Sequence, residues 1–228
     1  MIRPRVRYFA YGSNMLTARL RERVPSVTAI GIGQLEGHAL RWDKHSWRDT
    51  SGKCDAEFTG QHSDLVWGVV FELDPEDKPG LDQAEGLGNG HMEKAVNILT
   101  EAGPITAVTY LATDKDASLR PYHWYKALVI AGAREHGLPP SYRSRLELGI
   151  TVSDPDPSRA SIHNALEARA TPHRGVTRST QYGEQSPRTA HLHSDLERGA
   201  RFDVREVVSR RWPRLDGVRY GSTFTGGC

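Results

Sequence analysis

The stretch YFAYGSN, residues 8–14, places a run of aromatic residues directly before a Gly-Ser-Asn turn. Aromatic enrichment that stops at a glycine is typical of a buried strand, so we expect a strand over residues 6–11. Ser13 or Asn14 can cap a helix after this turn. The helix would bury an apolar stripe formed by Met15, Leu16, Leu20 and Val24. The chain therefore begins as strand, tight turn and helix.

Alternation of strand and helix patterns continues as far as residue 148. The run VWGVVFELD, residues 66–74, is rich in β-branched and aromatic residues and predicts a central strand. Residues 28–47 are strand-like, and residues 48–64 read as a loop with one short strand inside it. Residues 95–113 predict a hairpin around Ala-Gly-Pro. Helices are expected over residues 79–85, 121–136 and 141–148.

Length and charge distribution indicate one domain with an appendage. The 228 residues carry a formal net charge of only +2, which favours neither a nucleic acid nor an acidic membrane as partner. From Pro155 onward the composition changes to twelve Arg, no Lys and eight acidic residues. We therefore expect a domain over residues 1–153 and an Arg-rich, mostly mobile extension over residues 154–228.

Apolar runs and cysteines indicate the compartment. No stretch approaches the roughly 20 apolar residues that span a bilayer, and the basic start MIRPRVR leads into no apolar signal core. Cys54 and Cys228 are too few and too far apart for a disulfide scaffold. We expect a soluble, cytoplasmic protein with free thiols, and nothing around Cys54 indicates a nucleophile.

The Gly-Ser-Asn turn offers chemistry as well as geometry. A turn between a strand and a helix exposes consecutive backbone N–H groups, and the helix N-terminus adds partial positive charge. Such a turn can hold a carboxylate or a phosphate. The alternative is that Gly12 only permits the turn and Asn14 only caps the helix.

Five short segments, taken together, resemble the gamma-glutamylcyclotransferase family of the AIG2-like superfamily. Each segment alone is weak, but their order and spacing over about residues 6–150 are specific. The glutathione-specific branch is less similar, because its turn differs at the position of Asn14. The segments are YFAYGSNM, VWGVVFEL, LDQAEGLGNG, YLAT and YKALVIAGAREHGLPPSY.

This resemblance implies an α+β fold, a small mixed β-barrel with flanking helices and a cavity at the end of the first strand. It implies an enzyme of glutathione metabolism that acts on a small γ-glutamyl molecule. Such an enzyme releases an amine or amino acid while the glutamyl group cyclises to 5-oxoproline. It also implies that no metal or organic cofactor takes part.

The resemblance also assigns site residues. Glu85 matches the family's catalytic glutamate, a general acid/base, and the dipole at a helix C-terminus would favour a proton-accepting carboxylate there. Tyr110 and Tyr125 match tyrosines that line the pocket. The residues expected to hold the glutamyl oxygens are Tyr11, Gly12, Ser13 and Asn14.

One position departs from the family pattern. Where the family has a tyrosine shortly after the Glu-Gly pair, this chain has Met92, preceded by His91. A phenol is replaced by a thioether, which puts the identity of the substrate in doubt more than the reaction. One alternative is that His91 restores a polar contact, but we expect it to be a water-exposed loop residue.

Several alternatives remain open at this point. A binding or regulatory protein on the same scaffold would use the basic extension to engage a partner, although the carboxylate of Glu85 disfavours it. A deprotecting enzyme that removes a γ-glutamyl cap from a product amine is a variant of the same chemistry. Metal binding is disfavoured, because no acidic or thiol partner accompanies the nearby histidines, which are His163, His173, His191 and His193.

Overall fold

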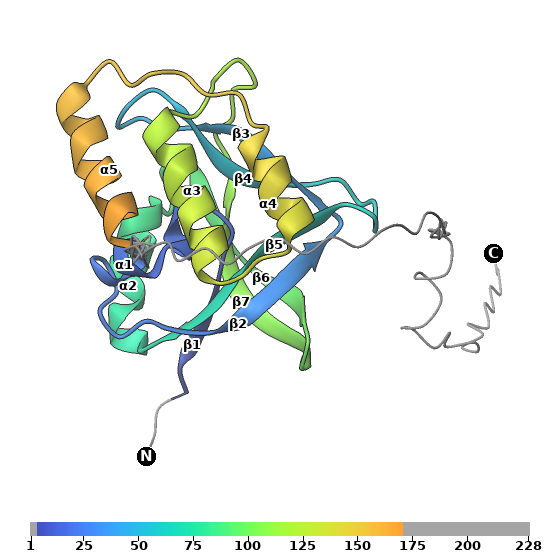
Figure 1. Cartoon of the computed structure of the whole chain (residues 1–228). Coiled ribbons are helices and arrows are strands. Elements are labelled where there is room, and N and C mark those ends of the chain that lie inside the picture. Colours follow the sequence, from blue (N-terminus) through green and yellow to red (C-terminus); the bar gives the residue numbers. More distant parts are fainter. Residues whose placement is uncertain (1–3, 171–228) are drawn as a thin grey trace, which may run out of the picture. The chain divides into compact units, whose positions relative to one another are not determined.

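The computed structural model describes residues 4–170, in which a five-stranded closed barrel carries a layer of helices on one side (Figure 1). The barrel strands follow the order β1-β5-β2-β6-β7. Their bounds are β1 Val6–Ala10, β2 Thr28–Glu36, β5 Leu65–Leu73, β6 His91–Thr100 and β7 Gly103–Ala112. The sheet is mixed, because β1 runs antiparallel to β5 and parallel to β7.

The central strand β5 has its position because it is apolar on both faces. It pairs with β1, where Tyr8 faces Phe71, and with β2, where Gly33 faces Gly68. A Cβ on Gly33 would lie 2.4 Å from Ile98, and one on Gly68 would lie 2.4 Å from the Ala10 carbonyl oxygen. These two glycines therefore let the barrel walls approach more closely than any other residue would allow.

A second, two-stranded sheet lies beside the barrel. It consists of β3, His38–His45, and β4, Gly52–Phe58. The strand expected within residues 48–64 is thus seven residues long. It brings Lys53 and Cys54 toward the end of β1.

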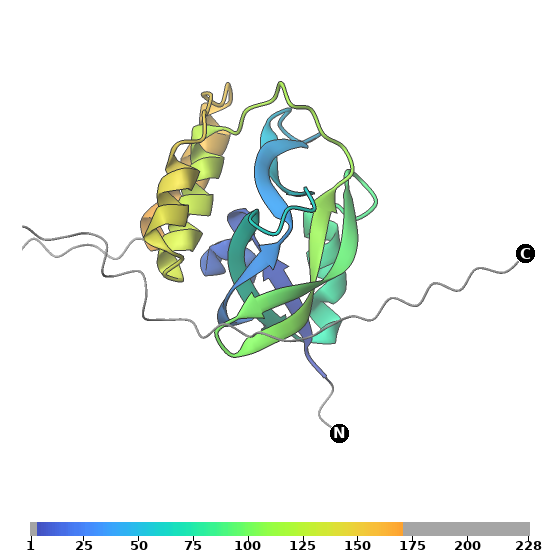
Figure 2. The same ribbon diagram turned by 90° about the vertical axis from the view of Figure 1, so that its right-hand side faces the viewer.

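Helices cover one side of the barrel, and Figure 2 shows α3, α4 and α5 as a layer beside the strands. The helix expected after the turn is a short 3-10 helix followed by a single α-helical turn. The helical bounds are η1 Ser13–Met15, α1 Thr17–Arg21, η2 Pro75–Asp77, α2 Lys78–Glu85, α3 His123–Glu135, α4 Pro140–Glu147 and α5 Pro157–Ala170.

Helix α5 is the main difference from the sequence-based expectation, which placed its residues in a mostly mobile extension. Leu166 is buried, the ring of His163 stacks on Trp124 at 4.0 Å, and Arg159 pairs with Asp154. The helix is hard to predict because its few apolar residues stand among Pro, Ser and Arg. The domain boundary at residue 153 stays a prediction, and residues 171–228 of the expected extension lie outside the described residues.

Candidate functional site

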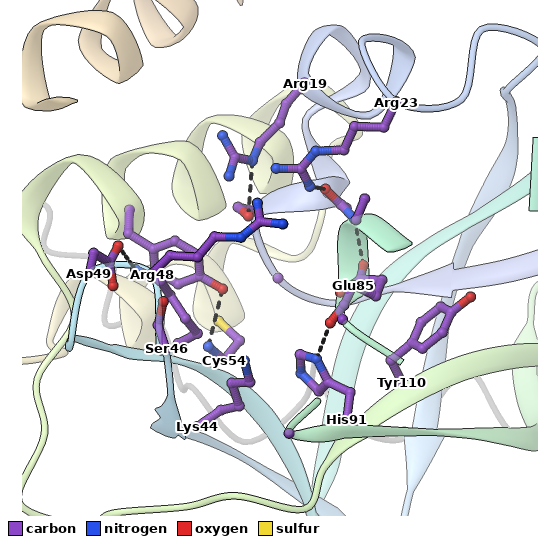
Figure 3. Close-up of a pocket in the computed structure, with 18 of the residues that line it drawn as sticks. Arg19, Arg23, Lys44, Ser46, Arg48, Asp49, Cys54, Glu85, His91 and Tyr110 are labelled. Atoms are coloured by element: carbon purple, nitrogen blue, oxygen red, sulfur yellow. Dashed lines mark hydrogen bonds and ion pairs between the residues drawn. The ribbon is translucent and has the colours of Figure 1, made fainter. Parts of the chain in front are cut away.

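A cavity of about 800 Å³ opens at the end of β1. Its walls come from the turn after β1, the C-terminal end of α2, the strands β4 and β7, the start of α3, and α5. Figure 3 shows charged side chains from several of these elements pointing into it. All the site residues expected from the sequence line this cavity: Tyr11, Gly12, Ser13, Asn14, Glu85, Tyr110 and Tyr125.

Glu85 is the last residue of α2, and two side chains hold one of its carboxylate oxygens. Gly86 ends the helix in the left-handed conformation, with φ of 72°, which a residue with a Cβ adopts only at a cost. The Tyr8 hydroxyl donates to Oε1 of Glu85 at 2.7 Å, and Nδ2 of Asn14 donates to the same oxygen at 2.5 Å. Among the side-chain hydrogen bonds of residues 4–170 both reach Oε1, which leaves Oε2 without a side-chain donor in this part of the chain.

The amide of Asn14 is oriented by Arg23. The Arg23 guanidinium donates to Oδ1 of Asn14 at 2.7 Å. Because a guanidinium can only donate, Oδ1 must face Arg23, and the amide NH2 must therefore face Glu85. The pKa of the Tyr8 phenol is raised by burial and by the neighbouring Glu85, so Tyr8 remains a donor. The sequence reasoning missed both Tyr8 and Arg23.

The turn is tightly packed, which explains its glycine. A Cβ on Gly12 would meet the Tyr125 hydroxyl at 3.2 Å and the Cys54 Cβ at 3.3 Å. Within η1 the first amide to bond is Met15 N–H, which donates to Gly12 O at 3.0 Å, so the preceding amides begin the helix without an acceptor inside it. The expected side-chain cap is absent at η1 and α1. Asn14 instead binds Glu85, and Ser13 Oγ accepts from Arg19 at 3.2 Å.

The three pocket tyrosines use their hydroxyl groups within the protein. Tyr11 donates to the Tyr110 carbonyl oxygen at 2.5 Å, and Tyr110 donates to Asp82 at 2.5 Å. Tyr125 accepts from the Cys54 amide at 3.1 Å. Burial raises the pKa of all three phenols. Their rings form cavity walls, while a contact of these hydroxyls with substrate stays a prediction.

His91 and Met92 differ from the expectation. His91 is not a loop residue but begins β6, is partly buried and lines the cavity, whereas the Met92 side chain is 49% exposed and does not line it. Nδ1 of His91 lies 2.5 Å from the Glu85 carbonyl oxygen and must donate, because a carbonyl only accepts. Burial lowers the pKa of His91, so the ring is neutral at pH 7 and keeps its lone pair on Nε2.

Basic residues dominate the rest of the lining and were not predicted. They come from separate segments, in α1, β3, β4, α5 and the loops between these elements, so no run of basic residues predicts them. Lys53 is 15% exposed, bonds to Asp49 at 2.7 Å and lies over the rings of Trp124 and Tyr125. The basic lining residues are Arg19, Arg23, Lys44, Arg48, Lys53 and Arg159.

Other reactive groups near the cavity are inert or scattered. Burial raises the pKa of the Cys54 thiol to about 12, so it is not a thiolate at neutral pH. Within residues 4–170 no three His, Cys, Asp or Glu side chains cluster as metal ligands would. His163 contacts Arg19, while the other histidines considered for metal, His173, His191 and His193, lie outside the described residues. No helix in the described part of the chain has the length and apolarity to cross a membrane.

Comparison with known proteins agrees with this geometry. A model of the AIG2-like family matches residues 65–146. The human gamma-glutamylcyclotransferase is 33% identical over 149 residues, which cover 61% of this chain and 76% of that protein. The mouse gamma-glutamylcyclotransferase is 30% identical over 169 residues, which cover 70% of this chain and 85% of that protein.

A solved structure of a gamma-glutamyl cyclotransferase superposes with a TM-score of 0.64 at 28% identity, covering 71% of this chain and 99% of that one. The barrel, the flanking helices and the sequence similarity over most of the relatives' length lead to one conclusion. This chain belongs to the gamma-glutamylcyclotransferase family.

Proposed function

We propose that the protein is a γ-glutamyl cyclotransferase in which Glu85 carries the proton between the two amines of the reaction. The α-amine of the glutamyl group attacks the γ-carbonyl carbon and forms the ring C–N bond of 5-oxoproline. The C–N bond to the leaving amine breaks. The single observation that carries the proposal is a carboxylate at a cavity wall with one oxygen held by Tyr8 and Asn14, which leaves the other oxygen for the substrate.

Proton transfer explains why the reaction needs a fixed carboxylate. The attacking nitrogen starts as an ammonium with three protons and must lose two of them to become the lactam N–H, while the leaving amide nitrogen gains two and departs as an ammonium. Glu85 takes these protons in turn and passes them to the leaving nitrogen, so the carboxylate is restored and no proton is lost or gained overall. The bonds from Tyr8 and Asn14 stabilise the charged carboxylate between turnovers and keep it in place.

The turn after β1 supplies the second component, which is orientation. Nucleophile and electrophile belong to one molecule, so catalysis depends on holding the ring-closing conformer. We assign the glutamyl oxygens to the turn of Tyr11, Gly12, Ser13 and Asn14, which lies next to Glu85 in the same cavity. Amide donors aimed at the developing oxyanion of the γ-carbonyl would also stabilise the transition state, by about 3 kcal/mol for each donor.

The test is Glu85→Gln, which removes the proton-accepting carboxylate and keeps the size of the side chain. With a panel of γ-glutamyl amino acids and amines, and 5-oxoproline measured by mass spectrometry, we expect kcat to fall by about 10²–10⁴-fold. The matched control is Glu101→Gln, at the exposed turn between β6 and β7, which should retain activity. Full activity of the Glu85 variant would refute its role, and a panel without any turnover would favour the binding protein.

A further inference from the structure

The cavity contains more positive charge than a γ-glutamyl group can match. Two carboxylates line it, Glu85 and Asp49, against the six basic side chains named above. Asp49 is paired with Lys53, and Arg159 is paired with Asp154. Four lining residues remain, which we call the cationic wall: Arg19, Arg23, Lys44 and Arg48.

No carboxylate in residues 4–170 lies within ion-pair distance of the cationic wall. Arg19 is 8% exposed and Lys44 is 8% exposed, so neither charge is well solvated. The side-chain partners of Arg19 are the neutral groups Ser13 Oγ and His163 Nδ1, and Arg23 donates to the Asn14 amide. Unpaired charges that are this buried are costly unless an anion completes the site.

The members of the cationic wall interact electrostatically in pairs, Arg19 with Arg23 and Lys44 with Arg48. Figure 3 shows the guanidinium groups of Arg19, Arg23 and Arg48 pointing into the cavity near Glu85. After burial, the charge of Arg23 lowers the pKa of Arg19. Burial also lowers the pKa of Lys44, where the raising effect of Glu85, Asp114 and Asp49 precedes a smaller lowering by Arg48. Repulsion between like charges decreases when negative charge is bound between them.

Charge balance identifies which part of the substrate supplies that negative charge. The glutamyl group carries one carboxylate and one ammonium, so it is neutral overall when it binds. With Glu85 as the only unpaired carboxylate of the lining, the cationic wall keeps an excess of three positive charges. A leaving amino acid with a single carboxylate would cancel one of them.

We propose that the cationic wall is a subsite for a leaving amine that carries at least two negative charges, such as a dicarboxylic or phosphorylated amino acid. This inference rests on the proposed function, because the leaving amine is a product of that reaction. The cavity volume of about 800 Å³ has room for both halves of such a substrate.

The first test compares leaving groups of similar size whose side chains differ in charge. The substrates are γ-glutamyl-glutamate and γ-glutamyl-phosphoserine, with γ-glutamyl-glutamine as the isostere that has a neutral side chain and γ-glutamyl-lysine as the member with a cationic side chain. We expect kcat/KM at least tenfold higher for the acidic pair than for the isostere, and lowest for the lysine compound. The relative rates of the acidic pair distinguish dicarboxylate from phosphate. Equal rates for glutamate and glutamine would overturn the inference while leaving the cyclotransferase reaction intact.

The second test measures binding without turnover. In a Glu85→Gln background, calorimetry should give γ-glutamyl-glutamate at least tenfold tighter binding than γ-glutamyl-glutamine. Arg48→Gln should reduce that ratio, because it removes one charge of the cationic wall. Arg48 is exposed, so its replacement should leave the core intact. The control Arg21→Gln removes an exposed charge of α1 that does not line the cavity and should preserve the ratio. Preferential binding without any 5-oxoproline from the wild type would refute the reaction and keep the subsite, whereas equal affinities would refute the subsite.

Discussion

Asn14 stands at the centre of the polar network around Glu85. Its amide links the Arg23 guanidinium, on one side, to the Glu85 carboxylate on the other. Tyr8 completes the arrangement from β1, and its hydroxyl also lies 3.4 Å from Nδ2 of Asn14. Tyr8 in β1, Asn14 in η1 and Arg23 in the loop after α1 thus fix one carboxylate oxygen. Removing any of the three should change the orientation of the other two.

Tyr8→Phe removes one donor to Glu85 without changing the ring. A hydrogen bond to a charged group contributes about 1.5–3 kcal/mol, so we expect kcat to fall by at least about tenfold. The T-shaped contact of the Tyr8 ring with Tyr110 should persist, so the loss of stability should be limited to this hydrogen bond and lower the thermal unfolding midpoint by a few degrees. Steady-state kinetics and thermal melting check both expectations. If kcat is unchanged, Asn14 alone suffices to hold the carboxylate.

At the scale of elements, α3 positions the turn by direct backbone contact. A Cβ on Gly132 of α3 would lie 2.5 Å from the Leu16 amide nitrogen and 2.6 Å from the Met15 carbonyl carbon. Both atoms belong to the segment that follows Ser13 and Asn14. The helix and the turn can therefore approach only because residue 132 lacks a side chain.

Gly132→Ala should consequently destabilise the fold despite the higher helix propensity of alanine. Overpacking costs about 1–3 kcal/mol, against about 1 kcal/mol gained in propensity. Chemical denaturation should show a net loss of stability, and kcat should fall because η1 shifts. Ser144→Ala, at an exposed position of α4, provides the propensity gain without the clash and should be neutral or stabilising. A stabilised Gly132 variant would contradict the close approach.

The packing of α5 on α3 depends on a neutral histidine. Nδ1 of His163 must accept from the Arg19 guanidinium, so it carries no proton. Burial, and then the charges of Arg19, Lys53 and Arg23, lower the pKa of His163 to about 4, while Asp49 acts in the opposite direction. Between pH 4 and 6.5 the unfolded chain therefore binds a proton that the folded chain does not.

Stability should accordingly fall as the pH is lowered from about 6.5 toward 4, because the unfolded state gains protons in this window. His163→Gln should lower stability at pH 7 by losing the stacking on Trp124, yet show a smaller further loss on acidification. Thermal melting from pH 4.5 to 7 checks this. The exposed His62→Gln variant serves as control and should follow the wild type. Parallel pH profiles for wild type and the His163 variant would contradict a neutral His163.

At the scale of the whole molecule, local patterns and long-range pairing differ in how far the sequence predicts them. Strands such as β5 and helices such as α3 are predictable because their apolar pattern is local. The strand order is not, since β1 pairs with β5 and β7, which lie far along the chain. The family resemblance anticipates that Glu85 and the turn lie together. Tyr8 and Arg23 are missed because their partners depend on the closed barrel and on side-chain orientation.

The distribution of charge leads to a prediction for the entire fold. The net charge of +2 produces little repulsion over the molecule as a whole. Among the residues that line the cavity, the cationic wall is the main cluster of unpaired like charges. Raising the ionic strength from 0.01 M to 0.15 M shortens the Debye length from about 30 Å to about 8 Å and screens that repulsion. It also weakens surface ion pairs such as Arg7 with Glu72, which acts in the opposite direction.

The comparison of variants separates these two effects. Arg48→Gln removes one charge of the cationic wall, so added salt should raise the unfolding midpoint of this variant less than that of the wild type. Arg21→Gln removes an equal charge that does not line the cavity, and this variant should keep the wild-type salt response. Thermal melting at the two ionic strengths measures the difference. Identical salt responses of the Arg48 and Arg21 variants would mean that water already screens the cationic wall, and that no bound anion is needed to stabilise it.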